Sequence, residues 1–405
     1  MWSLAGAALL VGLQAVEPAA EGLKALEAGK YQEAVQLLAK AVETGPADYA
    51  AYFHLALAQS FLGHDPEAIG AYKKALELKP GLYPAELNLG IVLLRQKQAG
   101  EAIPHLEFAA KQKPQETRPL LYLGQAWFET GDYARARQAY EAAAALDPKS
   151  APAQLGLAQS LARQNRLPEA EPHFRKAAEL DASFKDALLE LAVLFEKNQQ
   201  AEPAIAIYRE FPDNPGARER LGALLMAAGR PSEAVPHLEW VVGKSPTAAT
   251  RVTLALAYRR TNQPEKELAV LEQAVQAEPA SLDLRMFYGR ALRDQKNYSA
   301  AARQFLQAVQ AKPDLLEAWN ELAAMLISLG DNEQALAALD RVKALGGESE
   351  GHLYLRAIVL DKLKDVKGAL ATYQRFLAAS QGRHPEEEFK ARQRVRVLEK
   401  ELSRR

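Results

Sequence analysis

Hydrophobic residues in this chain follow a helical spacing that restarts about every 34 residues. The segment 117–150 shows it clearly: Leu120, Leu123, Gly124 and Trp127 form one series, and Ala136, Tyr140 and Ala143 form a second. Residues three and four positions apart lie on the same face of a helix. Each half of the segment therefore predicts one amphipathic helix.

Turn and stop residues separate these two predicted helices. Gly131-Asp132 ends the first helix, because glycine suits the residue after a helix C-terminus, and Pro148 ends the second. Gly124, Ala136 and Ala143 are small enough to let helix backbones approach closely, while Trp127 and Tyr140 fill the space beside them.

The same arrangement recurs along the whole chain. Pro46, Pro80, Pro114 and Pro148 are 34 residues apart, and Ala34, Ala68, Ala102, Ala136 and Ala170 keep the same step. Such a period is the signature of a repeat protein. The predicted units are 15–48, 49–82, 83–116, 117–150, 151–184, 185–214, 215–247, 248–281, 282–315, 316–349 and 350–383. The sixth, with 30 residues, and the seventh, with 33, depart from the period.

These units resemble tetratricopeptide repeats. "AYFHLALAQSFLGHDPEAIGAYKKALELKP" at 51–80 and "AWNELAAMLISLGDNEQALAALDRV" at 318–342 carry the pattern of that family, and the resemblance covers about 15–383. It implies an all-α fold, a right-handed α-solenoid of helix-turn-helix repeats whose first helices line a concave groove. In such arrays each repeat buries its apolar face against its neighbours, so the ends need polar caps.

Several units depart from the family pattern. Pro18 and Glu21 occupy usually apolar sites in the first unit, Ala182 replaces the stop proline of the fifth, and Glu267 stands where alanine is usual in the eighth. The eleventh unit also lacks the stop proline. The shortened sixth unit predicts either a bend near 211–216, dividing repeats 1–6 (16–214) from repeats 7–11 (215–383), or a deletion without structural consequence.

The C-terminal residues 384–405 predict a capping helix. Pro385 suits a helix start, and acidic residues in the first turn with basic residues toward the end favour the helix dipole. Phe389, Val395, Leu398 and Leu402 are expected to cover the last repeat.

Composition and the N-terminus bear on location. The formal net charge is −1, which gives no general field for nucleic acid, and the chain has no cysteine. Residues 1–15, "MWSLAGAALLVGLQA", contain a ten-residue apolar core that is too short to span a bilayer and suits a signal peptide. No Lys or Arg precedes this core. The segment therefore predicts export to the periplasm or secretion, with cleavage near Ala15. The alternatives are a frayed apolar first turn or a start codon placed too late, and with them a cytoplasmic location.

No catalytic signature is present. The chain lacks GxxxxGK, GxGxxG, HExxH and GxSxG, and repeats occupy about 370 residues, which leaves no room for a catalytic domain. We expect no enzymatic activity, no catalytic residue, no cofactor and no metal.

Three histidines share one frame: His105, His173 and His237 each follow a proline at the twenty-third position of a repeat. Equivalent positions two repeats apart are on the order of 20 Å apart, so the three cannot bind one zinc ion. We expect them to face away from the groove, with Pro104 and its equivalents in the first turn of a second helix.

The family pattern predicts which side chains line the groove, in two zones. The apolar zone is Phe53, Leu57, Phe61, Leu87, Asn88, Ile91, Leu94, Tyr122, Gln125 and Phe128. Exposed apolar patches mark interaction sites, although some of these residues are equally suited to packing against the next repeat.

The basic zone is Arg259, Arg260, Met286, Phe287, Arg290 and Arg293. Guanidinium groups bind carboxylates and phosphates, so this zone predicts an acidic peptide or another anion. The alternative is a solvated face neutralised by Asp283, Asp294 and Glu321.

The predicted function is a non-catalytic scaffold or adaptor that binds an extended peptide or partner helix in the groove. The alternative is a non-catalytic subunit of a bacterial envelope enzyme or of an export or assembly complex for polysaccharide or outer-membrane biogenesis. We expect a protein or peptide partner, and we expect neither nucleic-acid binding nor a stable membrane span.

Overall fold

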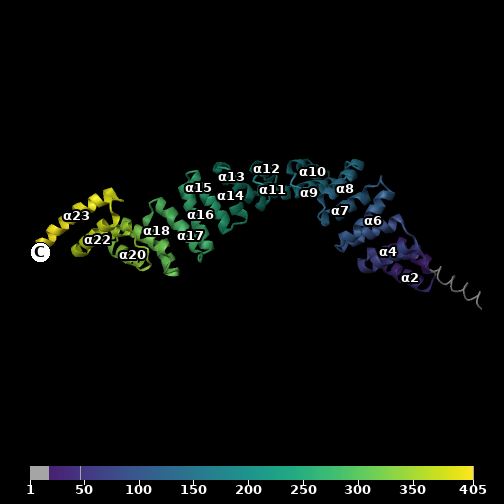
Figure 1. Ribbon diagram of the computed structural model, residues 1–405, viewed down its shortest axis with the longest axis horizontal. Coiled ribbons are helices and arrows are strands. Elements are labelled where there is room, and N and C mark those ends of the chain that lie inside the picture. The colour runs from purple at the N-terminus through teal and green to yellow at the C-terminus, as the bar shows by residue number, and fades with distance from the viewer. Residues whose placement is uncertain (1–17, 46, 405) are drawn as a thin grey trace, which may run out of the picture. The chain divides into compact units, whose positions relative to one another are not determined.

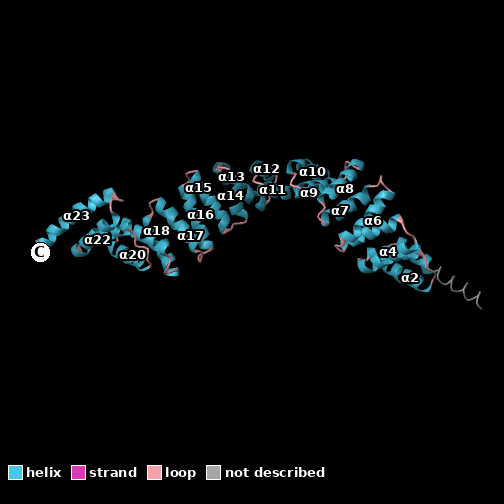
Figure 2. Ribbon diagram, in the orientation of Figure 1, coloured by secondary structure: helices cyan, strands magenta, loops and turns pink. Residues whose placement is uncertain are grey.

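The computed structural model describes residues 18–45 and 47–404, and throughout these residues the regular structure is helical (Figure 2). The predicted signal peptide 1–15 lies outside the described residues. The chain divides into two compact units, which end and begin at Ile207 and Tyr208.

The described part of the first unit begins with a helical segment at 18–27, followed by further helices, several of which are labelled in Figure 1. They are α2 (Tyr31–Thr44), α3 (Tyr49–Phe61), α4 (Asp65–Leu78), α5 (Tyr83–Arg95), α6 (Ala99–Gln112), α7 (Thr117–Glu129), α8 (Tyr133–Leu146), α9 (Ala151–Arg163), α10 (Leu167–Leu180), the short 3₁₀ helix η1 (Ala182–Phe184), α11 (Ala187–Lys197) and α12 (Ala201–Tyr208).

The second unit holds the remaining helices. They are α13 (Pro215–Ala227), α14 (Pro231–Lys244), α15 (Ala248–Arg260), α16 (Pro264–Ala277), α17 (Leu282–Asp294), α18 (Tyr298–Ala311), α19 (Leu316–Leu329), α20 (Asn332–Ala344), α21 (Glu350–Lys362), α22 (Val366–Ser380) and α23 (Pro385–Ser403).

Helix boundaries follow the predicted repeat. The second helix of all eleven units begins at the seventeenth residue of its unit, from Tyr31 to Val366. The first helix begins at the first residue of units two to eleven, except in the sixth, where α11 begins at Ala187, two residues late, after η1. The periodicity of the sequence therefore fixed the register of the helix pairs.

The deletion in the sixth unit falls in its second helix. α12 has 8 residues, whereas the other second helices have 13 to 15. The two compact units meet seven residues before the predicted division between 214 and 215. The bend near 211–216 stays a prediction.

One turn geometry joins the two helices of each repeat. The fifteenth residue has a left-handed backbone, with φ between 56° and 84°, in all eleven units. These residues are Gly29, Gly63, Lys97, Gly131, Asn165, Gln199, Gly229, Asn262, Lys296, Gly330 and Lys364. Gly131 and the N-cap Asp132, whose carboxylate accepts from the Arg135 N–H, confirm the predicted break in 117–150. Six units make the same turn without glycine.

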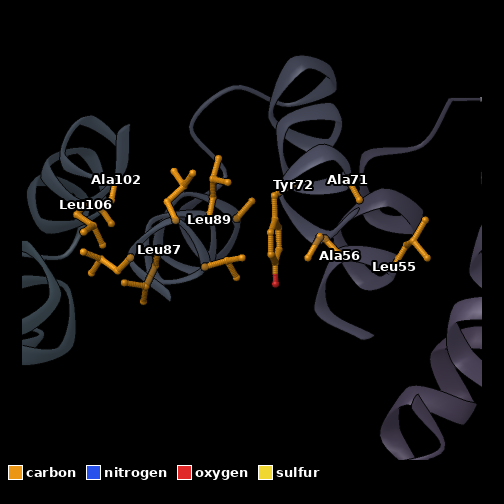
Figure 3. Close-up of a cluster of buried hydrophobic side chains, with 14 of the residues drawn as sticks. Leu55, Ala56, Ala71, Tyr72, Leu87, Leu89, Ala102 and Leu106 are labelled. Carbon is orange, nitrogen blue, oxygen red and sulfur yellow. The ribbon is translucent and has the colours of Figure 1, made fainter. Parts of the chain in front are cut away.

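Small residues permit close packing within and between repeats. A Cβ added at Gly124 would lie 2.9 Å from the Tyr140 ring, and one added at Gly156 of the next repeat would lie 2.4 Å from it. Figure 3 shows a related cluster in the first unit, where the fully buried Tyr72 lies among Ala56, Leu89 and their neighbours. Helices of one repeat pack on each other, and several first helices also contact the first helix of the next repeat; α3, for example, contacts both α4 and α5.

The last repeat is covered by α23, with one correction. Leu398 is fully buried, and Val395 and Leu402 pack against the cluster that includes Tyr373 and Phe376. Phe389 is instead 61% exposed, so the expectation that it covers the last repeat was wrong. Ala391 and Glu388 face the repeat in its place, because they share the helical face of Leu398.

Candidate functional site

A pocket of about 420 Å³ lies between three consecutive first helices of the second unit. α15 contributes Val252, α17 most of the wall, and α19 Glu317, while the segment after α18 adds Lys312 and Leu315. The α17 residues are Leu282, Asp283, Leu284, Met286, Phe287 and Arg290. Its walls are mainly apolar, with charged groups of both signs, as in many sites that bind a side chain or small ligand.

This pocket brings together part of the predicted basic zone. Met286, Phe287 and Arg290 line it, and the Arg259 guanidinium lies 5.2 Å from the centre of the Phe287 ring. Met286 is buried, so it packs behind the pocket wall and presents little surface to a ligand. Arg260 is directed elsewhere, because it donates to the Met226 carbonyl oxygen at 2.8 Å.

All four arginines of the basic zone have partners within the chain. Arg259 pairs with the buried Glu267 of α16. Arg290 pairs with Glu317 and, at 3.3 Å, with Glu321, which lies 2.7 Å from Arg293. Two of the acids that sequence analysis named as neutralising groups, Asp294 and Glu321, take part in these ion pairs. The guanidinium groups therefore already have interactions within the chain, with which an added anion would have to compete.

Lys312 is the pocket cation that sequence analysis missed. It is exposed, it lines the pocket, and no carboxylate among the described residues is recorded in an ion pair with it. The predicted groove residues all lie on first helices, whereas Lys312 follows the second helix α18 directly before Pro313. Its position in the loop before α19 is the feature of the sequence that could have indicated Lys312 as a pocket residue.

The apolar zone is mostly part of the core of the first unit. Leu87 and Leu94 are each 5% exposed, which removes them from any surface that a partner could contact. Phe53, Leu57, Ile91 and Tyr122 pack partly buried against the same core cluster. Asn88 and Phe128 are partly buried, and the exposed Gln125 donates to Glu129.

Phe61 is the strongly exposed member of this zone. Its side chain is 57% exposed, and its ring stacks on Tyr31 of the preceding repeat with centroids 4.6 Å apart. The structure thus leaves one aromatic pair at the surface, rather than the continuous apolar strip that the sequence suggested.

The three histidines are less free than exposed surface residues, and their direction away from the groove stays a prediction. They are half-buried, and His105 and His173 bond to a residue 19 positions earlier, on the first helix of the same repeat. The His105 Nδ1 lies 2.6 Å from a Glu86 oxygen, and the His173 Nδ1 lies 2.8 Å from the Gln154 oxygen. The equivalent residue for His237 is Arg218, and the buried His237 Nδ1 has no hydrogen-bond partner among the described residues.

The prolines before these histidines also lie deeper than predicted. Pro104, Pro172 and Pro236 lie inside α6, α10 and α14, at the sixth helical residue, which is the second turn. At that depth proline removes an intrahelical hydrogen bond. The carbonyl oxygen four residues before each proline loses its hydrogen bond. Because all three prolines are exposed, water can solvate these carbonyl oxygens.

Two kinds of feature are absent from the described residues, a metal-binding cluster and a membrane-spanning helix. Within residues 18–45 and 47–404, no cluster of three His, Asp or Glu side chains has the arrangement of a metal site. In the same described part of the chain, no helix has the length and apolar character needed to cross a membrane.

Stacked pairs of antiparallel helices, each packing on the next, define the class of this protein as an α-solenoid of helix-turn-helix repeats. A tetratricopeptide repeat model matches nearly the whole described chain, at 19–83, 87–151, 155–218, 219–281, 252–315, 288–350 and 326–384. The chain belongs to the tetratricopeptide repeat family. Arrays of this kind offer extended surfaces to protein partners.

One curated relative is the Vi polysaccharide export protein VexE of Salmonella typhi. It is 32% identical over 129 residues, which are 30% of this chain and 20% of VexE. This chain thus matches about a fifth of the length of that relative.

Solved structures of MamA also resemble part of the chain. MamA residues 41 to the end from Desulfovibrio magneticus RS-1 are 26% identical and cover 43% of this chain and 98% of their own, with a TM-score of 0.40. MamA AMB-1 is 26% identical and covers 42% and 99%, with a TM-score of 0.39.

Proposed function

We propose that this protein is a non-catalytic scaffold that binds an extended peptide or partner helix on its first helices, with the pocket between α15, α17 and α19 as the anchor point. The observation that carries the proposal is this pocket, which three successive repeats build jointly. A single repeat could not form this pocket, so binding there would require several folded repeats.

The pocket chemistry favours an apolar side chain next to an acidic group. Val252, Leu282, Phe287 and Leu315 supply apolar wall, and Lys312 supplies a cation that forms no ion pair with another described residue. The arginine-lined basic zone contributes to this site through Arg290 at the wall, rather than as four free guanidinium groups. A short segment with a large apolar residue beside Asp or Glu fits this arrangement.

A site-specific crosslink tests the proposal. A photo-crosslinking residue at Phe287, in the pocket wall, is compared with one at Gln310, exposed on the second helix α18. We expect a discrete partner from Phe287 and not from Gln310, and loss of that product when Val252→Trp fills the pocket. The same products from both positions would argue against a binding site here.

A second candidate function is a non-catalytic subunit of a bacterial envelope export or assembly complex, with the chain in the periplasm. The local similarity to VexE, a polysaccharide export protein, favours it. Purification of the native complex separates the two candidates. A stable stoichiometric export or biosynthetic subunit supports the second, and exchangeable peptide-like partners support the first.

A further inference from the structure

The outward face of α23 combines cationic side chains with exposed apolar side chains. At about 100° per residue, one arc of roughly 120° contains Phe389, Lys390, Gln393, Arg396, Val397 and Lys400 of this helix, together with its C-cap residue Arg404. We call these residues the basic face of α23. All of them are exposed, and the opposite side of the helix is the one that covers the last repeat.

The cations of the basic face differ from the other arginines of α23. Arg392 pairs with Glu388, and Arg394 pairs with Asp361 of α21 at 2.5 Å, so both have structural roles. No such ion pair is recorded, among the described residues, for Lys390, Arg396, Lys400 or Arg404. The acid that shares their arc, Glu386, lies in the first turn, away from three of the four cations.

Two large apolar side chains lie among these charges. Phe389 is 61% exposed and Val397 is 49% exposed, eight residues apart on the same face. From Phe389 to Arg404 the face extends about 22 Å along a regular helix. Such a helical face, with long cationic side chains, has no concave pocket for a particular side chain of a partner. It can, however, lie flat against a planar charged surface.

We propose that the basic face of α23 binds the surface of an anionic phospholipid bilayer. Lys and Arg would contact the headgroup phosphates, while Phe389 and Val397 would enter the boundary between headgroups and acyl chains. The helix stays docked on the last repeat, because the residues that anchor it lie on its other side. The binding is peripheral, and it places the rest of the array beside the membrane without a spanning helix.

Charge complementarity sets the expected strength. One basic residue near an anionic membrane contributes about 1 kcal/mol, which is about fivefold in partitioning. Four such residues can therefore give well over a hundredfold preference for anionic over neutral bilayers at low salt. The preference should fall steeply with added salt, because the Debye length shortens from about 10 Å at 0.1 M to about 3 Å at 1 M.

The test is cosedimentation of the full chain with vesicles. Vesicles of phosphatidylcholine with one-third phosphatidylglycerol are compared with pure phosphatidylcholine, at low and high salt. The test variant is Arg396→Glu/Lys400→Glu. The matched control is Lys111→Glu/Lys343→Glu, which makes the same charge change at exposed lysines of α6 and α20. Circular dichroism confirms that each variant is folded.

We expect binding to the anionic vesicles only, retained by the control and reduced at least twentyfold by the test variant. Phe389→Ser should weaken binding severalfold while leaving its salt dependence unchanged. Equal loss in both double variants, or no binding to either vesicle, would overturn the proposal. Binding to polyglutamate through the same residues without binding to vesicles would also overturn it and would assign the face to an acidic polypeptide.

Discussion

Arg259 of α15 holds the carboxylate of Glu267 in α16, with both the guanidinium Nε and Nη2 2.7 Å from the same oxygen. The Glu267 side chain is 3% exposed and that of Arg259 is 39% exposed. Glu267 occupies the repeat position where alanine is usual, so this pair replaces an apolar contact with an ionic one.

The unequal burial predicts unequal effects of mutation. Arg259→Leu leaves a buried carboxylate without its partner and should lower the free energy of unfolding by about 1–3 kcal/mol. Glu267→Ala restores the usual residue and leaves an arginine that can reach water, so it should be close to neutral. Urea unfolding followed by circular dichroism measures both.

The neighbouring Lys266→Leu is the control for these two variants, because Lys266 pairs with Glu239 at the surface and exposed pairs contribute about 0–1 kcal/mol. Equal effects of Arg259→Leu and Lys266→Leu would contradict the structural role of the Arg259–Glu267 pair. The pair also makes Arg259→Glu unsuitable for testing ligand binding, since it would place two carboxylates together.

Turn geometry predicts opposite signs for two glycine substitutions. Gly131 has φ 84°, and Gly131→Ala should destabilise by about 1 kcal/mol, because a Cβ disfavours that conformation. Gly100 lies within α6 with open space around its Cβ position, so Gly100→Ala should stabilise by up to about 1 kcal/mol. Thermal unfolding of the two variants gives the comparison, and shifts of the same sign would refute this explanation of the turn.

The non-glycine turns make the reverse prediction. Lys97 has φ 59° at the same repeat position as Gly131, so Lys97→Gly relieves backbone strain. The greater entropy of glycine in the unfolded chain offsets part of this gain, which leaves an expected stabilisation of a few tenths of a kcal/mol up to about 1. A clear fall in melting temperature would contradict it.

Contact between repeats can be tested at Tyr140. Gly156→Ala introduces a methyl group against the Tyr140 ring and should destabilise by about 1–3 kcal/mol. Tyr140→Leu removes the ring, so the cost of Gly156→Ala should shrink in that background. A double-mutant cycle measures this coupling, and strictly additive free energies would show that the two sites do not touch.

The pH dependence of stability should have a contribution from His237. Burial first, and then the charges of Arg218 and Arg209, lower the pKa of His237 below its ordinary value of 6.5. The unfolded chain therefore binds the proton more readily than the folded chain, and stability falls as the pH drops through 6.5 toward the lower folded pKa.

Replacement of His237 by Gln should reduce the loss of melting temperature between pH 7.5 and pH 5.5. Burial also lowers the pKa of His54, His173 and His352, so part of the acid sensitivity should remain. An unchanged pH profile in the His237→Gln variant would show that this histidine does not contribute.

Sequence periodicity was sufficient for the helix pairs, because the 34-residue step and the helical spacing are properties of neighbouring residues in the chain. It gave the start of α7 at Thr117 and the break at Gly131. It made no prediction for the turns at Lys97 and the other non-glycine positions, where the folded chain holds a left-handed backbone that a side chain disfavours.

The candidate sites depended on tertiary structure. Position in a first helix made Leu87 resemble a groove residue, yet the neighbouring repeat buries it. The arginines of the basic zone form ion pairs with Glu267, Glu317 and Glu321. The exposed cation of the pocket is instead Lys312, which lies in a loop. The sequence by itself determined the repeat, its register and its family. The tertiary structure alone decided which side chains face solvent, because exposure and ion pairing depend on groups that adjacent repeats bring from distant parts of the chain.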